Sequence, residues 1–397
     1  MKILAILFRV PFPLKDGGAI ALYNLVKGLS EQGHELTILS YNTTKHYVNP
    51  LPQEITSLGK VITVDIDNRI KPIKALLNLF GSQSYHVERF ITDEFSKTLQ
   101  EILEKETFDV IHFDGLFTSM YLETAKKYAS KTPCALRQHN VEHQIWERVA
   151  EGAKGLKKWY LTILASRLKK YEQSVLPQFD TIVPITAIDA QSFKKMGVKK
   201  QYVLPVGVDT NRFESKLNPD RKSVFHLGSL DWMPNQEGVK WFVELVWPLV
   251  LKEEPEASFY IAGRDIPDWI KAYHGKNKVY IAGEVESASD FMNSKEIMIV
   301  PLKSGSGMRV KIIEGFAARK AIVSTAVGAE GINYEKGTHI EIADSEKEFA
   351  SKILILLNNE PKIKELGEQA FELVKKEYSN AATVKGLVGY YSELISE

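Results

Sequence analysis

The chain has one cysteine, Cys134, among its 397 residues, so no disulfide framework can form within it. This composition is typical of proteins from a reducing compartment. Cys134 lies in the apolar stretch CALRQ, and we expect its thiol to be buried and inert. The sequence also contains no Gly-x-Gly-x-x-Gly motif, which argues against a dinucleotide-dependent oxidoreductase.

An excess of either charge is also missing, since 51 Lys and Arg face 50 Asp and Glu and the formal net charge is +1. This balance gives no reason to expect a nucleic-acid partner. No segment has the ~18 consecutive apolar residues that span a bilayer. The opening MKILAILFRVPFP is interrupted by Arg9 and Pro11, so it predicts a buried first strand rather than a signal peptide. We expect a cytoplasmic protein, at most peripheral at the inner face of a membrane.

Short apolar runs alternate with helical patterns along the whole chain, which predicts an α/β fold with doubly wound parallel sheets. The length favours two Rossmann-like domains, and a stretch rich in Pro, Asp and Asn near 205–222 suggests the linker between them. We therefore expect an N-terminal domain over 1–205, a C-terminal domain over 206–379 and a terminal helix over 380–397. A deep cleft between such domains lies at the carboxyl ends of their strands, where α/β proteins bind ligands.

The predicted strands are short apolar segments, and a helical pattern follows most of them. In the first domain they cover 3–8, 35–39, 61–64, 110–113, 134–138 and 181–184. In the second domain they cover 223–227, 258–261, 278–281, 297–300, 321–324 and 339–342. The clearest helical patterns cover 19–32, 93–105, 157–175, 187–196, 345–357, 361–377 and 380–395.

The most informative segment is 299–332, in which an apolar strand runs into a Gly/Ser loop and then into a helix. The loop comprises Ser304, Gly305, Ser306, Gly307 and Met308. Small residues let backbone N–H groups approach phosphate oxygens, and a helix N-terminus adds about half a positive charge.

Charged residues complete this segment. Arg309 and Lys311 add two cations, and Glu314, one helical turn after Lys311, can accept hydrogen bonds from ribose hydroxyls. The pattern suits a nucleoside diphosphate, and hence an activated sugar. The alternative is that Arg309 and Lys311 are solvated surface charges.

Other candidates follow the predicted strands of the first domain. Gly17 and Gly18 precede a helix and could bring N–H groups to the donor diphosphate; a plain turn is the alternative. His139 follows a strand and is the best candidate for a residue near the sugar or acceptor, unless it is a packed core histidine. Asn140 beside it, and His112 with Asp114 at the end of another strand, are assigned to the acceptor side, with packing as the alternative for His112.

The chain resembles glycosyltransferase family 4, whose members are retaining enzymes of the GT-B fold. The similarity rests on an ordered set of segments that spans most of the chain, in addition to 299–332: FPLKDGGAIALYNLVKGLSEQGHELTIL (Phe12–Leu39), FDVIHFDGL (Phe108–Leu116), RQHNVEH (Arg137–His143), LPVGVDTNRF (Leu204–Phe213), FHLGSLDWMPNQEGVKWF (Phe225–Phe242) and FYIAGRD (Phe259–Asp265). The resemblance implies transfer of a sugar from a nucleotide-diphosphate sugar to a hydroxyl of a saccharide or lipid-linked acceptor. Nothing in the sequence calls for a cofactor or a metal, so we expect neither to be needed.

The family pattern further implies a role for individual residues. His139 contacts the transferred sugar, Gly228 and Arg264 contribute to the donor site, and the terminal helix returns to the first domain. Retention implies same-face attack, in which the departing phosphate oxygen takes the acceptor proton.

This sequence departs from the family pattern at two places. The usual motif has two glutamates, and Ser306 stands where the first is expected. Many members also have an Arg directly after the residue equivalent to Gly228, where this chain has Ser229. The sequence resembles a subgroup with G-S-x-x-W-x-P-N and G-S-G-x-R-x-K-x-x-E. We infer that Arg309 and Lys311 replace the missing cations.

Two other motifs predict metal sites that we consider unfounded. The stretch from His139 to His143 fits H-x-x-E-H, but a zinc site of this kind needs both histidines in one helix. The Asp65-Ile66-Asp67 triplet fits D-x-D, but it lies at the end of a predicted strand and a solvated turn is the better explanation. The basic amphipathic stretch 154–172 could rest on an anionic membrane, although packing with extended lysines is the commoner explanation.

The departures leave two other functions open. A nucleotide-sugar-binding protein without catalytic activity would fit the missing glutamate and the missing Arg/Lys pair. A nucleotide-sugar epimerase would need acid/base carboxylates near the sugar, and no convincing set is present.

Overall fold

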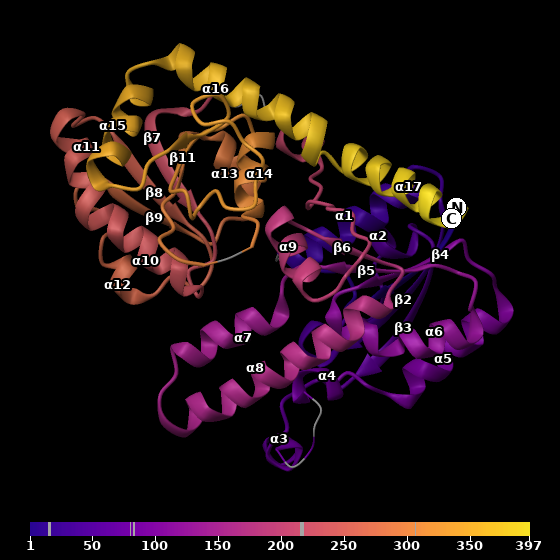
Figure 1. The fold of residues 1–397 in the computed structure, drawn as a ribbon. Helices are drawn as coiled ribbons and strands as arrows, with labels where there is room; N and C mark the ends of the chain where they lie inside the picture. The colour runs from indigo at the N-terminus through magenta and orange to yellow at the C-terminus, as the bar shows by residue number, and fades with distance from the viewer. Residues whose placement is uncertain (15–16, 80, 82–83, 215–217, 306) are drawn as a thin grey trace. The chain divides into compact units, whose positions relative to one another are not determined.

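The computed structural model describes residues 1–397 except 15–16, 80, 82–83, 215–217 and 306. The chain forms two compact units, each built on a six-stranded sheet. The N-terminal unit comprises Met1–Gly207 together with Thr383–Glu397, and the C-terminal unit comprises Val208–Ala382. Figure 1 shows helices around each sheet. The parallel sheet in each unit confirms the predicted α/β fold with doubly wound parallel sheets.

All paired strands of the N-terminal sheet run parallel, in the order β3-β2-β1-β4-β5-β6. The strands are β1 (Lys2–Leu7), β2 (Glu35–Thr43), β3 (Lys60–Ile66), β4 (Val110–Asp114), β5 (Cys134–Gln138) and β6 (Thr181–Pro184). β4, β5 and β6 are buried along their whole length because helices cover both faces of a parallel sheet. The opening segment is therefore a buried strand, as predicted.

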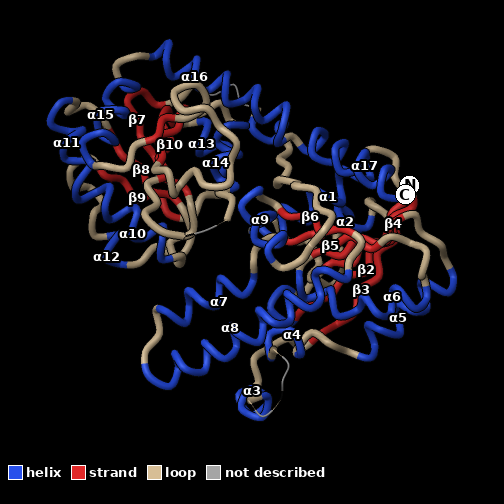
Figure 2. Tube along the Cα trace, viewed as in Figure 1, coloured by secondary structure: helices blue, strands red, loops and turns tan. Residues whose placement is uncertain are grey.

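Helices connect these strands (Figure 2). They are α1 (Gly17–Glu31), α2 (Gln53–Thr56), α3 (Pro72–Asn78), α4 (Tyr85–Glu88), α5 (Asp93–Lys105), α6 (Leu122–Tyr128), α7 (Glu142–Glu151), α8 (Gly155–Val175) and α9 (Ala187–Lys195), with short 3-10 turns at Thr44–His46, Leu116–Tyr121 and Leu176–Gln178. α5 shows how the sequence sets a boundary. The hydroxyl of Thr92 caps the backbone N–H of Phe95, and Asp93 and Glu94 favour the positive end of the helix.

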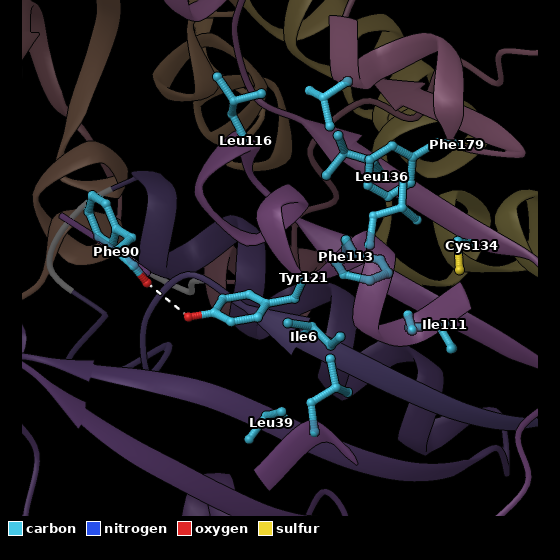
Figure 3. Close-up of a cluster of buried hydrophobic side chains, with 14 of the residues drawn as sticks. Ile6, Leu39, Phe90, Ile111, Phe113, Leu116, Tyr121, Cys134, Leu136 and Phe179 are labelled. Carbon is cyan, nitrogen blue, oxygen red and sulfur yellow. Dashed lines mark hydrogen bonds between the residues drawn. The ribbon is translucent and has the colours of Figure 1, made fainter. Parts of the chain in front are cut away.

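One hydrophobic core of this unit lies between the sheet and helices α5, α6 and α8. Figure 3 shows part of it, with Tyr121 surrounded by apolar side chains and its hydroxyl donating to the carbonyl of Phe90 at 3.0 Å. Cys134 is in the same cluster, and burial raises the pKa of its thiol to about 12. The expectation of a buried thiol is therefore confirmed, and a raised pKa disfavours the reactive thiolate form.

The C-terminal sheet is also parallel, in the order β12-β11-β10-β7-β8-β9. Its strands are β7 (Asp220–Leu227), β8 (Ser258–Ala262), β9 (Val279–Gly283), β10 (Lys295–Val300), β11 (Ala321–Ser324) and β12 (Glu341–Ile342). Its helices are α10 (Met233–Trp241), α11 (Trp247–Glu253), α12 (Asp268–Lys271), α13 (Ala288–Asn293), α14 (Val310–Ala317), α15 (Glu346–Leu357) and α16 (Glu360–Leu373). A 3-10 turn covers Thr210–Phe213, and π-helical turns cover Phe242–Val246 and Val374–Tyr378.

The expected linker over 205–222 is too long. β7 begins at Asp220, although its first residues are charged and carry no apolar signal. These residues pair along the strand instead: Asp220 forms an ion pair with Lys295, and the backbone N–H of Lys222 donates to Glu296 at 2.6 Å.

The terminal helix, α17 (Asn380–Ser396), belongs to the N-terminal unit from Thr383 onward. Val384, Leu387 and Tyr391 are buried in one cluster with residues of β1 and α1. Among the described residues, no helix combines the length and the apolar character that crossing a membrane would require.

Candidate active site

The loop between β10 and α14 contains several of the predicted donor-binding residues of the C-terminal unit. Gly305 and Gly307 have φ of 110° and 81°, a region that favours glycine. A Cβ on Gly305 would lie 2.7 Å from Nη2 of Arg309 and 3.1 Å from the ring of Trp232. Backbone conformation and close packing therefore both require a small residue at Gly305. Ser306 lies outside the described residues.

Arg309 is the N-cap residue of α14 and is only 6% exposed. Its guanidinium lies 5.1 Å from the ring centroid of Trp232, and Nη1 donates to the carbonyl of Gly307 at 2.8 Å. A solvated surface charge would have none of these features. The loop and the tryptophan hold this cation at the N-terminal end of α14, where an anion is favoured.

Lys311 lies in the first turn of α14, and its Nζ donates to Oδ1 of Asn235 at 2.9 Å. A Cβ on Gly228 would overlap with this Nζ, so Gly228 leaves the space that the ammonium group occupies. Burial, together with the nearby Arg309, lowers the pKa of Lys311 from 10.5 to about 7. A lysine in this state gains charge when an anion arrives.

Glu314 follows one turn later and is half-buried rather than exposed. Burial raises the pKa of its carboxyl to about 7, although Arg212 and Lys311 act in the opposite direction. The carboxyl is therefore poised between its neutral and ionised forms near neutral pH. It can accept hydrogen bonds from ligand hydroxyls in the ionised form.

The carboxyl ends of β7, β8 and β10 are adjacent in this sheet, which brings the remaining donor candidates together. Gly228 follows β7, and Gly263 and Arg264 follow β8. A Cβ on Gly263 would overlap with the Gly228 carbonyl, and the Leu230 N–H donates to the Arg264 carbonyl at 2.9 Å. Both strand ends are thus fixed by their backbones.

The last two donor candidates lie in the β10–α14 loop. Ser304 donates to Glu237 at 2.9 Å, and Met308 packs against the core.

In the N-terminal unit, His139 directly follows β5, as predicted. Its Nε2 lies 2.5 Å from Oδ1 of Asp114, and the ring of Phe8 packs edge-on against its imidazole. The side chain is 15% exposed, so it is not a closed core histidine. Asn140, beside it, is half-buried. Gly17 and Gly18 open α1, and a Cβ on Gly17 would meet no atom within 4 Å.

The acceptor-side prediction for His112 and Asp114 needs correction. Both side chains are completely buried and cannot touch an acceptor. His112 Nδ1 lies 2.6 Å from the Tyr391 hydroxyl, and Asp114 Oδ2 lies 3.8 Å from Nη1 of buried Arg137. Of this cluster, only His139 reaches the surface. Asp114 therefore contacts His139 and does not itself reach the surface.

The two metal motifs do not assemble a metal site. His139 precedes α7 and contacts Asp114, whereas His143 inside α7 contacts Glu172 at 2.5 Å. Asp67 is paired with Arg69 and Lys71, and both lower the pKa of its carboxyl. In the described part of the chain, no group of three His, Cys, Asp or Glu is arranged to hold a metal ion.

Sequence reasoning missed several residues of the two sites. Trp232 and Asn235, which contact Arg309 and Lys311, lie in the quoted G-S-x-x-W-x-P-N motif, so their position was a usable signal. Arg137 lies in the quoted RQHNVEH segment, so it could also have been found from the sequence. Tyr391 has no local signal, because 279 residues separate it from His112.

Two family models and a full-length relative match the sequence of this chain. The model described as "Glycosyltransferase Family 4" matches residues 15–212, and the model described as "Glycosyl transferases group 1" matches residues 221–359. A Klebsiella pneumoniae protein named "Uncharacterized 44.6 kDa protein in cps region" is 22% identical over 96% of this chain and 97% of its own length.

Solved structures share the fold. A sucrose-phosphate synthase from Thermosynechococcus elongatus aligns over 100% of both chains, with a TM-score of 0.72 and 14% identity. Anabaena HepE in complex with UDP aligns over 99% of this chain and 100% of its own, with a TM-score of 0.65 and 12% identity. The two family models together cover most of the sequence, and the sheets match the GT-B architecture. The chain is therefore a glycosyltransferase of the GT-B fold, related to group 1 and family 4.

Proposed function

We propose that this glycosyltransferase is retaining and metal-independent, and that it moves a sugar from a nucleotide-diphosphate sugar to a hydroxyl acceptor during polysaccharide or glycoconjugate assembly. The observation that carries the proposal is the pair of cations at the start of α14. Arg309 and Lys311 are both held in place next to a Gly/Ser loop and a helix N-terminus. The similarity to HepE, whose structure contains UDP, supports a nucleotide donor.

The donor lies on the C-terminal unit in this proposal. Backbone N–H groups of the loop, Arg309 and Lys311 bind the diphosphate, and Glu314 binds the ribose. As the bond between the anomeric carbon and the phosphate oxygen breaks, negative charge grows on the diphosphate. Fixed cations stabilise that charge most in a partly dry site, which supports transfer without a metal ion.

The acceptor hydroxyl attacks the anomeric carbon from the face that the diphosphate leaves. The new carbon–oxygen bond forms as the old one breaks, and the departing phosphate oxygen takes the acceptor proton. No protein nucleophile is needed, and the configuration at the anomeric carbon is retained. His139 binds the transferred sugar or the acceptor from the N-terminal unit.

A cavity of about 840 Å³ in the N-terminal unit is suited to a saccharide or lipid-linked acceptor. It lies at the carboxyl end of β3, and His139 follows the carboxyl end of β5, so both are at the same edge of the parallel sheet. Charged side chains of both signs line it together with apolar ones: Arg69, Lys71, Lys74, Arg89, Asp65, Asp67, Glu88, Leu77 and Ile91. Such a lining fits a polar molecule that also has an apolar part.

Membrane contact through 154–172 belongs to the same proposal. Leu161, Leu164 and Leu168 of α8 are buried, whereas Leu156 and Trp159 are 85% and 56% exposed beside Lys157 and Lys158. An apolar pair surrounded by lysines suits the surface of an anionic leaflet. The chain would then work in the cytoplasm, at the inner face of the membrane. The Klebsiella relative, named for a cps region, supports a role in polysaccharide assembly.

The experiment is a donor screen followed by product analysis. Nucleotide diphosphates and their sugars are tested for thermal stabilisation of the protein, and stabilising donors are then incubated with saccharide acceptors with and without EDTA. We expect a product whose anomeric configuration, read by NMR coupling constants, matches the donor, with equal yield in EDTA. An inverted product would refute retention, and loss of yield in EDTA would refute metal independence.

The non-catalytic alternative keeps one observation in its favour, which is Ser306 at the position of the first glutamate. The same screen separates the two functions. A protein that binds nucleotide sugars but neither transfers nor slowly hydrolyses them would be a binding protein.

A further inference from the structure

We propose that Tyr391, in the C-terminal helix, is a positioning residue that orients His139 through His112 and Asp114. The inference rests on the proposed role of His139 near the sugar or the acceptor. It assigns a function in the site to α17, whose sequence carries no motif.

The first link joins α17 to β4. Tyr391 is completely buried, and its hydroxyl lies 2.6 Å from Nδ1 of His112. Burial raises the pKa of this phenol well above its usual range, so the hydroxyl keeps its proton. Burial also lowers the pKa of His112, which favours the neutral imidazole. Nε2 of His112 faces the carboxylate of Asp114, which only accepts, so we assign the single imidazole proton to Nε2 and the donor role at Nδ1 to the Tyr391 hydroxyl.

The second link joins His112 to Asp114. His112 Nε2 lies 3.5 Å from Asp114 Oδ2, and neither atom has a hydrogen-bond partner in the described part of the chain. The separation is too long for a strong hydrogen bond, so the coupling is electrostatic. In a completely buried site such coupling is strong, because no water screens it.

The third link joins Asp114 to His139. Burial alone would raise the pKa of Asp114, but His139 and His112 outweigh it and hold the carboxylate ionised. Its Oδ1 lies 2.5 Å from Nε2 of His139. An ionised carboxylate accepts only, so Nε2 of His139 carries a proton and Nδ1 is the nitrogen left for a ligand.

The charged group on a neighbouring strand also favours the ionised form of Asp114. Arg137 on β5 places Nη1 3.8 Å from Asp114 Oδ2, and the same Nη1 donates to the carbonyl of Ala21 in α1 at 3.3 Å. Phe8 contributes only a ring edge to His139. Asp114 is therefore the one carboxylate that the two histidines and Arg137 share among the described contacts. Tyr391 determines which nitrogen of His112 faces it.

The chain offers a matched pair of variants for the test. Tyr391→Phe removes the hydroxyl and keeps the buried ring. Tyr390→Phe removes the neighbouring hydroxyl of the same helix, which contacts Thr181 at 2.7 Å instead of the histidine cluster. We expect Tyr391→Phe to lower kcat about ten-fold, the effect of losing one buried hydrogen bond, with the donor KM unchanged. Tyr390→Phe should leave both constants as they are.

A second measurement does not depend on activity. Nitrogen-15 NMR of the histidine side chains reports which ring nitrogen carries a proton. We expect Tyr391→Phe to change the Nε2 and Nδ1 chemical shifts of His139, and Tyr390→Phe to leave them unchanged. Signals of His139 that are identical in all three proteins would overturn the proposal, whatever the transfer assay gives.

His112→Phe keeps the test decisive if Tyr391→Phe does not fold, because it breaks the same chain without altering α17. Wild-type kcat and His139 signals in a folded His112→Phe protein would also overturn the proposal. If no donor is ever transferred, the proposed function fails, and the NMR result still decides whether Tyr391 orients His139.

Discussion

Gly228 and Lys311 share one small volume: a side chain on Gly228 would occupy the position of the Lys311 Nζ. The lysine reaches this volume from α14, and Asn235 of α10 holds it there at 2.9 Å. A side chain at position 228 would therefore displace the ammonium group of a lysine that belongs to another element. The sequence assigns Gly228 to the donor site. In the structure, the space beside this glycine holds the ammonium group of Lys311, which would bind the phosphate.

A Gly228→Ala substitution should therefore displace Lys311 and weaken binding of a nucleoside diphosphate about ten-fold, the size of one lost charge-assisted hydrogen bond. Isothermal titration calorimetry measures this change. Gly389→Ala is the control, because a Cβ there meets no atom within 4 Å and the residue lies in a helix. Equal diphosphate affinity in both variants would contradict the relationship.

Binding of a diphosphate at pH 8 should take up a proton. Lys311 has a pKa of about 7 and is mostly neutral at that pH, and an anion beside it raises its pKa and recharges it. Calorimetry in buffers of different ionisation enthalpy counts the proton. Lys311→Met should abolish the uptake, whereas Lys320→Met should not, since Lys320 is also buried but donates to the Lys295 carbonyl.

The lowered pKa of Lys311 also predicts how the stability of the ligand-free protein depends on pH. Between pH 7 and 10.5 the unfolded chain binds more protons at Lys311 than the folded one, so the free energy of unfolding rises with pH in this window. Urea titrations at several pH values should show that the free energy of unfolding rises less steeply with pH in Lys311→Met than in the wild type. An unchanged slope would mean that the folded lysine keeps its ordinary pKa.

Trp232→Leu should release the Arg309 guanidinium and lower kcat/KM for the donor about five- to thirty-fold, which corresponds to the loss of a partly desolvated cation–π contact of about 1–2 kcal/mol. Trp269→Leu is the matched control, since Trp232 and Trp269 are 37% and 39% exposed and Trp269 packs only on Tyr273 among the described ring contacts. Steady-state kinetics with varied donor decides between them. A similar loss in both variants would point to a general effect on folding.

Glu172→Gln should destabilise the N-terminal unit by about 2–4 kcal/mol, because a buried carboxylate that caps a helix and pairs with a histidine is lost. Glu172 accepts the backbone N–H groups of Glu142 and His143 and the His143 ring. Glu147→Gln removes an exposed ion pair with Lys169 between the same two helices and should cost under about 1 kcal/mol. Urea unfolding of both variants tests the difference.

Apolar periodicity was sufficient to predict most of the fold. β5, β6 and β11 match the predicted bounds because each is a short apolar run between polar turns. The start of β7 was missed because Asp220 and Lys222 are stabilised in the strand by partners on β10, which a local pattern cannot show.

The loop before α14 could be found from sequence for a similar reason, because its glycines and cations lie within one short segment. The electrostatics of the site could not be predicted from the sequence. The lowered pKa of Lys311 comes first from burial, and burial depends on strands that lie far from it in the sequence. The contact of His112 with Tyr391 likewise exists only after the chain has folded back.

The return of α17 also decides where this protein can be cut. A fragment that ends at Gly207 would lack Val384, Leu387 and Tyr391, and would leave the apolar surface of β1 and α1 open to water. Grafting 383–397 onto that fragment through a flexible tether would restore the missing surface. Domain dissection of this enzyme thus calls for a rejoined chain rather than a simple truncation.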